Sequence, residues 1–212
     1  MNQDDHFFSP IEQKYYNYYL SRRKQISKPF MNYLPPEQQF RHYVDLIESR
    51  GHVEFSPEYL DIEEDLKPIK SHITEYYSKN KSRVLQNPFN ISGLFELVRK
   101  HLVPFASSYY GCIPTIGYIK IIKSQPSSNA KDTQFFHRDP GSYNLLKAVI
   151  YINDVDSEGG PLVYVQGSNK DDLTGISGRS RLDDKYIQEK YKGHIKEITG
   201  PTGQVSFFNA KG

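Results

Sequence analysis

The sequence predicts an α+β fold, in which a helical first half precedes an antiparallel β half. Up to about residue 110, apolar residues recur at helical spacing between Pro and Gly breakers. After Pro114 the chain turns to short runs rich in Ile, Val, Tyr and Phe, separated by Gly, Pro, Asn and Asp. Because helices come first and strands follow without crossover helices between them, we expect a pair of antiparallel sheets supported by the helical half.

The length and charge of the chain restrict its class. Its 212 residues suffice for one buried core, so a single domain over residues 1–212 is expected. The 27 Lys and Arg residues nearly balance the 25 Asp and Glu residues, for a net charge of +2. This balance lacks the basic excess that neutralises nucleic acid phosphates, so nucleic acid is not an expected partner.

The cysteine count and the first residues indicate the compartment. Cys112 is the one cysteine, which rules out an internal disulfide, and the first ten residues have no signal-peptide pattern. No apolar run approaches the roughly 20 residues that a membrane span needs. The sequence therefore predicts a cytoplasmic protein without a membrane segment.

The helical half is expected over residues 36–110, after an N-terminal arm over residues 1–35. Its expected helices, each with apolar residues on one face, are residues 36–50, a segment that begins at Pro68, and residues 92–102. Gly51 stands at the C-cap of the first helix, and Pro104 is expected to end the third.

The β half, over residues 111–212, is expected to form an incomplete sheet-pair core. Its expected strands are residues 115–123, 145–153, 162–166, 194–198 and 204–209. Residues 169–193, which are charged and contain Gly, predict a long loop or lid.

The segment from Gln134 to Asp139 carries the chemistry. On an extended chain His137 and Asp139 project to the same side, so an imidazole and a carboxylate can bind one metal ion. The pair supplies two ligands of the facial triad that holds Fe(II) and leaves positions open. Its nitrogen and oxygen donors suit iron better than the thiolate-rich sites of structural zinc. The tripeptide alone is a weak signal, because it also occurs in capped turns and surface ion pairs.

The continuation of this segment makes the signal more specific. Residues 145–170 read LLKAVIYINDVDSEGGPLVYVQGSNK: an apolar strand, an acidic turn, Gly-Pro-Leu, and a second strand that ends in Gly-Ser-Asn-Lys. With the His-x-Asp before it, this stretch resembles the phytanoyl-CoA dioxygenase family, and residues 203–208 resemble a later strand of that family. The departures from the family's usual Pro, His and Asp are Gln166, Asn169 and Gln204.

The resemblance implies a double-stranded β-helix core (jelly-roll, cupin-like) and hydroxylation of a small organic substrate with Fe(II), O2 and 2-oxoglutarate. It implies that His137 and Asp139 bind Fe(II), that Tyr151 faces the 2-oxoglutarate, and that Gln134 is a recurrent glutamine of the site. In the family a distal histidine, the third ligand, follows the later strand, and an arginine that binds 2-oxoglutarate comes after it. The sequence ends at Gly212 before either one, so we expect a C-terminally truncated relative.

Alternation along a strand indicates two further cofactor-binding candidates. Tyr118 and Lys120 share one face of the strand expected over residues 115–123, where they could meet a dicarboxylate. A solvent-facing edge is the alternative, and it is the more usual place for a lysine.

Three other interpretations compete with this one. His194 could be the third ligand, although it opens a strand that comes too early. His137-Arg138-Asp139 with Asn144 fits a protein-kinase catalytic loop, but the glycine-rich loop and Asp-Phe-Gly are absent from the sequence, which argues against a kinase. The non-catalytic alternative is a ligand-binding jelly-roll remnant without a complete metal triad. Neither the substrate nor the oligomeric state is indicated.

Overall fold

The structure is a computed structural model that describes residues 38–86, 88–124, 136–137, 145–171 and 182–210. Its helices are η1 (Gln38–Phe40), α2 (Arg41–Arg50), α3 (Pro57–Leu60), α4 (Glu63–Lys79), α5 (Leu94–Leu97), the π-helical turn η2 (Val98–Leu102), α6 (Val103–Tyr110), η4 (Ser157–Gly159), η5 (Ser168–Lys170) and α7 (Asp184–Lys190). Its strands are β1 (His52–Phe55), β2 (Val84–Gln86), β3 (Lys120–Ile122), β4 (Leu146–Ile150), β5 (Leu162–Val165), β6 (Ile195–Ile198) and β7 (Val205–Asn209).

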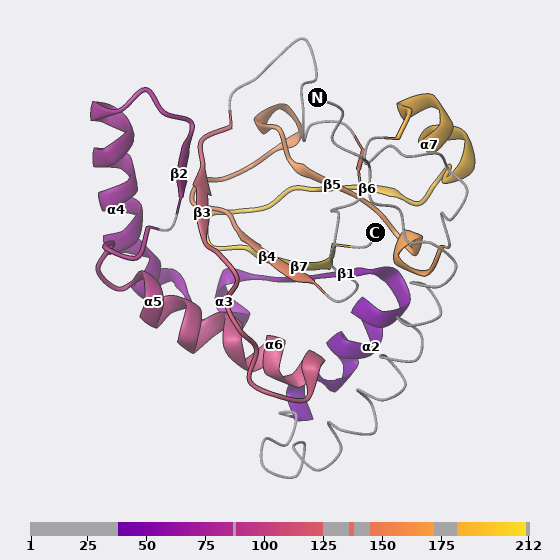
Figure 1. The fold of residues 1–212 in the computed structure, drawn as a ribbon, viewed down its shortest axis with the longest axis horizontal. Helices are drawn as coiled ribbons and strands as arrows, with labels where there is room; N and C mark the ends of the chain where they lie inside the picture. The colour runs from indigo at the N-terminus through magenta and orange to yellow at the C-terminus, as the bar shows by residue number, and fades with distance from the viewer. Residues whose placement is uncertain (1–37, 87, 125–135, 138–144, 172–181, 211–212) are drawn as a thin grey trace, which may run out of the picture.

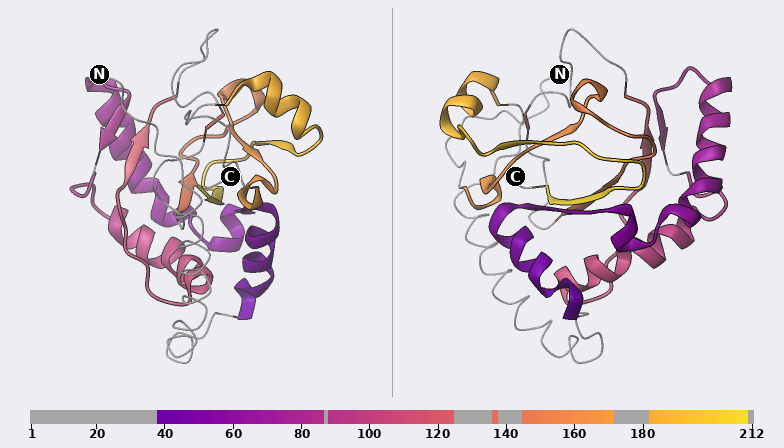
Figure 2. Two further views of the ribbon diagram at one scale, coloured as in Figure 1. Left: turned by 45° about the vertical axis from the view of Figure 1, so that its right-hand side comes forward. Right: turned by 180° about the vertical axis from the view of Figure 1, so that it is seen from behind.

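Every strand pair in the described residues is antiparallel. β7 lies between β1 and β4, β5 pairs with β6, and β2 pairs with β3. Figure 1 shows α2, α3, α5 and α6 along one side of the β4–β7–β1 sheet, and the β5–β6 sheet on its other side. The views in Figure 2 show the same arrangement of layers. The predicted mixture of helices with antiparallel sheets is therefore confirmed, although β1 and β2 lie among the first helices and α7 lies between β5 and β6.

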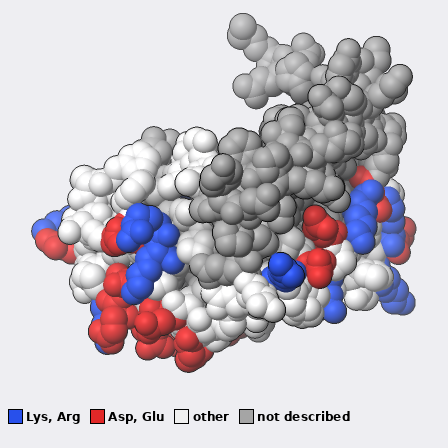
Figure 3. All heavy atoms as spheres, turned by 90° about the horizontal axis from the view of Figure 1, so that it is seen from below, with Lys and Arg blue, Asp and Glu red and all other residues white. Residues whose placement is uncertain are grey.

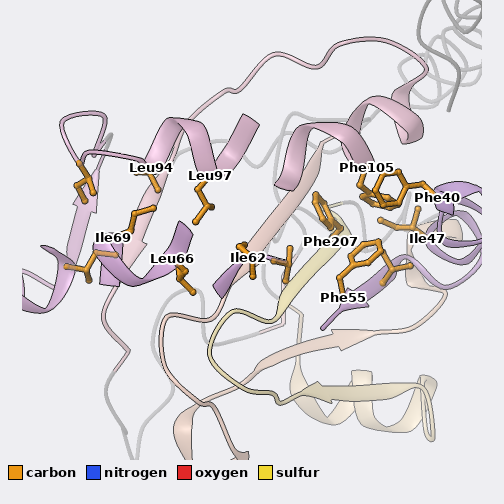
Figure 4. Close-up of a cluster of buried hydrophobic side chains, with 14 residues drawn as sticks. Phe40, Ile47, Phe55, Ile62, Leu66, Ile69, Leu94, Leu97, Phe105 and Phe207 are labelled. Atoms are coloured by element: carbon orange, nitrogen blue, oxygen red, sulfur yellow. The ribbon is translucent and has the colours of Figure 1, made fainter. Parts of the chain in front are cut away.

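The main hydrophobic core lies between the three-stranded sheet and the helices. Phe55 of β1 and Phe207 of β7 meet Phe105 of α6 and Phe40 of η1, with ring centroids 4.6–6.1 Å apart. Figure 4 shows these rings at one end of a cluster that continues along α4 and α5. Tilted and edge-on ring contacts of this kind add to the stabilisation from burial.

The first predicted helix is confirmed as η1 followed by α2. Gly51 takes the C-cap with φ +86°, and its N–H donates to the carbonyl of Ile47 at 2.9 Å. A Cβ at Gly51 would lie 2.3 Å from the hydroxyl of Tyr164, so the close approach of β5 also requires glycine here.

The second predicted helix begins five residues earlier than expected, at Glu63 rather than at Pro68. Three acidic residues in its first turn complement the helix dipole. Ile62, Leu66 and Ile69 lie on one buried face that runs across the proline. This burial outweighs the one backbone hydrogen bond that Pro68 cannot donate.

The third predicted helix does not end at Pro104, which is a correction to the sequence analysis. α5 passes through the π-helical turn η2 into α6, which continues to Tyr110. Pro104 falls in the first turn of α6, where a missing N–H is tolerated.

The five predicted strands are present as β3 to β7, although β3 covers only the last part of residues 115–123. β1 and β2 were not predicted. Residues 169–193, expected to be a loop, contain the end of η5 and all of α7, and the segment 172–181 and the N-terminal arm lie outside the described residues.

Charged side chains of both signs are interspersed on the face that Figure 3 shows. In the described part of the chain, no helix has the length and apolar character needed to cross a membrane.

Candidate functional site

Polar side chains face the space between the two sheets. Along β1 and β7, successive residues alternate between the helical core and the opposite side. The core takes Val53, Phe55, Val205 and Phe207. The opposite side takes His52, Glu54, Ser206 and Phe208. There the ring of Tyr164 from β5 lies 5.9 Å from that of Phe208 and 5.3 Å from that of His52, so the sheets face each other through these side chains.

Glu54 is the centre of a charged cluster on this side. Its carboxylate pairs with Lys196 of β6, lies 3.4 Å from Nε2 of His52, and accepts a hydrogen bond from Gln204 at 3.4 Å. The hydrogen bond from His52, followed by the contact with Lys196, holds the pKa of Glu54 below its usual range, against partial burial that raises it. The Glu54 side chain is 25% exposed and that of Lys196 is 42% exposed, so both charges keep contact with solvent.

Two buried polar atoms beside this cluster have no hydrogen-bond partner within the described part of the chain: Nδ1 of His52 and Oδ1 of Asn169. His52 is only 4% exposed. Because buried polar atoms in proteins are nearly always paired, these two atoms indicate contact with a water molecule or a ligand.

The turn after β5 connects this site to α2. The N–H of Gly167 donates to the carbonyl of Arg50 at 2.8 Å, and the side-chain amide of Asn169 donates to the carbonyl of Glu48 at 3.3 Å. These two hydrogen bonds hold the turn that carries Asn169 against the end of α2, far away in the sequence.

His101, another buried histidine, differs from His52 because both of its ring nitrogens have partners. Nδ1 lies 2.8 Å from the carbonyl of Leu60, and Nε2 lies 2.7 Å from a carboxylate oxygen of Asp65. These contacts connect η2 to α3 and α4, which indicates a structural role.

The fold resembles that of a solved enzyme. The non-haem α-ketoglutarate-dependent carbocyclase SnoK from nogalamycin biosynthesis superposes with a TM-score of 0.58, over 81% of this chain and 74% of that chain, at 14% sequence identity. No protein-family model and no curated protein sequence matches the chain. At this identity the likeness concerns the fold, and the chemistry in that description is a property of SnoK.

His137 directly follows a residue that packs on the β5–β6 sheet. It forms a single β-bridge and is partly buried. Phe136, directly before it, packs against Val165 of β5 and against Ile187 and Tyr191 at α7. Val165 follows Tyr164 on the strand, so this apolar cluster covers the face of β5–β6 that points away from β1 and β7.

Asp139 and Gln134 lie outside the described residues, so their place beside His137 stays a prediction. Among the residues that the structure does describe, no group of three or more His, Cys, Asp or Glu side chains is arranged to hold a metal ion. His194, considered above as a third ligand, is exposed and directly precedes β6.

Tyr151 is buried between the sheets, but its hydroxyl has two backbone partners. It donates to the carbonyl of Ile198 and accepts from the N–H of Leu162 at 3.1 Å. Burial raises the pKa of Tyr151, so the hydroxyl stays protonated. These contacts link β4 to both strands of the β5–β6 sheet, and a contact with 2-oxoglutarate stays a prediction.

Tyr118 and Lys120 do not line the space between the sheets. Tyr118 is 48% exposed, and the ammonium of Lys120 lies 4.9 Å from the centre of its ring. β3 pairs with β2 in a separate sheet, and Ile119 and Ile121 turn inward instead. Of the two orientations considered for this pair, the structure shows the solvent-facing one, so the cofactor role proposed for Tyr118 and Lys120 has no geometric support.

The charged cluster predicts a measurable pH dependence. Because the pKa of Glu54 is lowered in the folded state, its ionisation stabilises the fold above the pKa of the unfolded chain, and this stabilisation is lost as the pH falls through the folded-state pKa. Glu54→Gln should therefore lower the free energy of unfolding near neutral pH by about 1 kcal/mol and flatten its decline between about pH 6 and pH 3. Denaturant unfolding at a series of pH values measures both effects.

Glu197→Gln is the matched control, because Glu197 is an exposed glutamate on β6 next to Lys196. This variant should keep the pH profile of the unchanged protein. Parallel profiles for Glu54→Gln and the unchanged protein would contradict the stabilising role of the cluster.

Proposed function

We propose that this chain forms a double-stranded β-helix oxygenase, which hydroxylates a small organic substrate with Fe(II), O2 and 2-oxoglutarate. The observation that carries the proposal is the packing of Phe136 on one of two facing antiparallel sheets, directly before the His137-x-Asp139 sequence motif, in a fold that resembles a 2-oxoglutarate-dependent enzyme. Two facing sheets with helices on the outside also support a jelly-roll core.

The position of Phe136 supports an inward direction for His137. Phe136 belongs to the apolar cluster on the outer face of β5–β6. Successive side chains of an extended segment point to opposite sides, so the His137 imidazole is expected toward the space that Tyr164 and Phe208 share. Asp139, two residues on, is expected on the same side.

The donor set of this motif fits ferrous iron. An imidazole nitrogen from His137 and a carboxylate oxygen from Asp139 would hold Fe(II) as two members of a facial triad. When bound, iron with 2-oxoglutarate and O2 supplies the oxidation of a C–H bond. The part of the chain is to hold these ligands, to orient the substrate and to limit access of water.

Substrate recognition is assigned to the polar side chains between the sheets. Among the residues that the structure describes, Oδ1 of Asn169 has no donor and Nδ1 of His52 has no hydrogen-bond partner. The charged Glu54 and Lys196 lie beside His52. This arrangement suits a substrate with hydroxyl or amino groups better than a purely apolar one.

The second candidate is the non-catalytic alternative, in which the fold binds a ligand without a metal. Its support is the pair of buried polar atoms without a partner among the described residues, Nδ1 of His52 and Oδ1 of Asn169, because a ligand could fill both positions with no metal bound. The following titration separates the two proposals.

In a chain extended past Gly212 to include the expected distal histidine and arginine, anaerobic addition of Fe(II) and then 2-oxoglutarate should produce a weak visible absorption band that needs both additions and saturates. A folded sample that binds Fe(II) but shows no band would contradict the oxygenase proposal. Binding of 2-oxoglutarate in calorimetry that is unaffected by iron would favour the ligand-binding alternative.

A further inference from the structure

A pocket of about 410 Å³ lies at the C-terminal end of α4. It is lined by the last turn of α4, by the turn that joins α4 to β2, and by Lys123 after β3. Figure 1 shows this turn between α4 and β2, on the opposite side of the sheets from α7. The described residues that line the pocket do not belong to the proposed oxygenase site, so it needs its own explanation.

Hydrogen bonds hold the walls of the pocket together. The hydroxyl of Tyr77 donates to the carbonyl of Ile121 at 2.9 Å and lies 3.3 Å from the carbonyl of Arg83. The backbone N–H of Lys123 donates to the same Arg83 carbonyl at 2.9 Å. α4, the turn and the β2–β3 pair are thus connected around the hollow, so its shape is part of the fold.

The lining of this pocket is strongly basic. Its charged residues are Lys79, Lys81, Arg83 and Lys123, and no acidic residue is among the described residues that line it. The whole chain has nearly as many acidic as basic residues, so this local excess is not a reflection of composition.

Ordinary structural roles explain only part of this charge. Lys79 pairs with Glu75 at 2.6 Å, and a cation there also complements the C-terminus of α4. No described carboxylate forms an ion pair with Lys81 or Lys123. The ammonium of Lys123 lies 5.8 Å from the ring centre of Tyr77, on the pocket wall. Exposed cations from two separate segments therefore line one hollow, where a bound anion would offset their mutual repulsion.

We propose that this cationic pocket binds a phosphorylated small molecule through its phosphate groups. Phosphate oxygens accept charge-assisted hydrogen bonds from ammonium and guanidinium groups, and several cations favour a ligand with at least two negative charges. The volume of the pocket is in the range of small-molecule sites, which favours a compact ester over an extended nucleic acid strand. The proposal does not depend on the oxygenase function.

Calorimetric titration of the full chain with inorganic pyrophosphate, without added iron, tests this proposal. We expect saturable binding of one equivalent, which weakens as the salt concentration rises. The double variant Lys81→Glu with Lys123→Glu should bind at least about tenfold more weakly, which corresponds to about 1.4 kcal/mol. If that variant fails to fold, Lys81→Gln and Lys123→Gln measured separately should each weaken binding.

The matched control is Lys185→Glu with Lys192→Glu, which makes the same charge change at two exposed lysines elsewhere. It should leave the affinity within about twofold, because long-range charge effects are screened by salt. If the control loses as much affinity as the pocket variant, pyrophosphate is attracted by the net charge of the protein alone, and the proposal is overturned. Unsaturable binding of pyrophosphate would overturn it as well.

Two further binding measurements identify which kind of anionic ligand the pocket takes. If 2-oxoglutarate binds this pocket as tightly as pyrophosphate does, the pocket recognises carboxylates as well as phosphates, and the proposed ligand class is overturned. Binding to vesicles that contain phosphatidylserine, without binding of pyrophosphate, would indicate a membrane surface instead. His137→Ala should leave pyrophosphate binding unchanged, so failure here and failure of the oxygenase proposal can be told apart.

Discussion

Replacing His137 by alanine is expected to abolish the absorption band that Fe(II) and 2-oxoglutarate produce together, and with it the conversion of 2-oxoglutarate to succinate. The change removes the nitrogen donor of the proposed pair and leaves a carboxylate that holds iron poorly by itself. Loss of a group that merely orients a metal ligand already weakens metal binding by about 10–100-fold, so loss of the ligand itself should exceed this range. Anaerobic absorption titration and a succinate assay measure the two effects.

His194→Ala is the matched control for this experiment, because His194 is exposed and lies at the start of β6. It should retain both the band and succinate formation. An equal loss in both variants would point to His194 as a ligand as well, and a full signal in a folded His137→Ala protein would refute the proposed site. Thermal unfolding of each variant shows that neither result comes from a damaged fold.

Phe207→Ala should cause one of the largest losses of stability in this protein. Phe207 is 1% exposed, and its ring centroid lies 4.6 Å from that of Phe105 and 5.9 Å from that of Phe55. Truncation leaves a cavity where the central strand meets the helical layer, and the surrounding rings cannot fill it completely. We expect the free energy of unfolding to fall by about 3–5 kcal/mol.

Denaturant unfolding of Phe95→Ala provides the comparison. Phe95 lies on α5 and is 58% exposed, so its truncation should change the free energy of unfolding by less than about 0.5 kcal/mol. A loss below about 1 kcal/mol for Phe207→Ala would contradict its place in the core. Equal losses at the two positions would contradict the layer arrangement that separates them.

The elements predicted correctly are those with a strong local signal. α2 combines a periodic apolar face with a glycine cap, and β4, β5 and β7 are apolar runs bounded by turn residues. The two helix-boundary errors both involve prolines: the buried face of α4 runs across Pro68, and Pro104 falls in the first turn of α6, where its missing N–H is tolerated.

β1 was missed for a different reason. Its residues, His52–Phe55, form a short strand between two helices, too short for alternation to be recognised. Its partner in the sheet is β7, at the other end of the chain. Two strands that are so far apart in the sequence carry no local pattern which shows that they pair with each other.

The residues of the candidate site are likewise of two kinds: those that a local pattern indicated and those that only the fold brought together. The His137-x-Asp139 motif could be recognised from spacing, because alternation on an extended chain is a local property. Glu54 and Lys196 are 142 residues apart, and nothing in their neighbourhoods marks them as partners. Lys120 combines both kinds of information. The alternation of its strand was predicted correctly, but which side of the strand faces solvent depends on the sheet that β3 joins.

The sequence by itself thus determined the α+β class, the helix faces and most strands, and it indicated an imidazole–carboxylate motif. These features follow from backbone periodicity and from residues that are close in the chain. Only the tertiary structure decided that His52, Glu54 and Lys196 meet between the sheets, and that lysines and an arginine gather around one pocket. The physical reason is that such meetings depend on strand pairing and packing over long sequence separations, which no local pattern encodes.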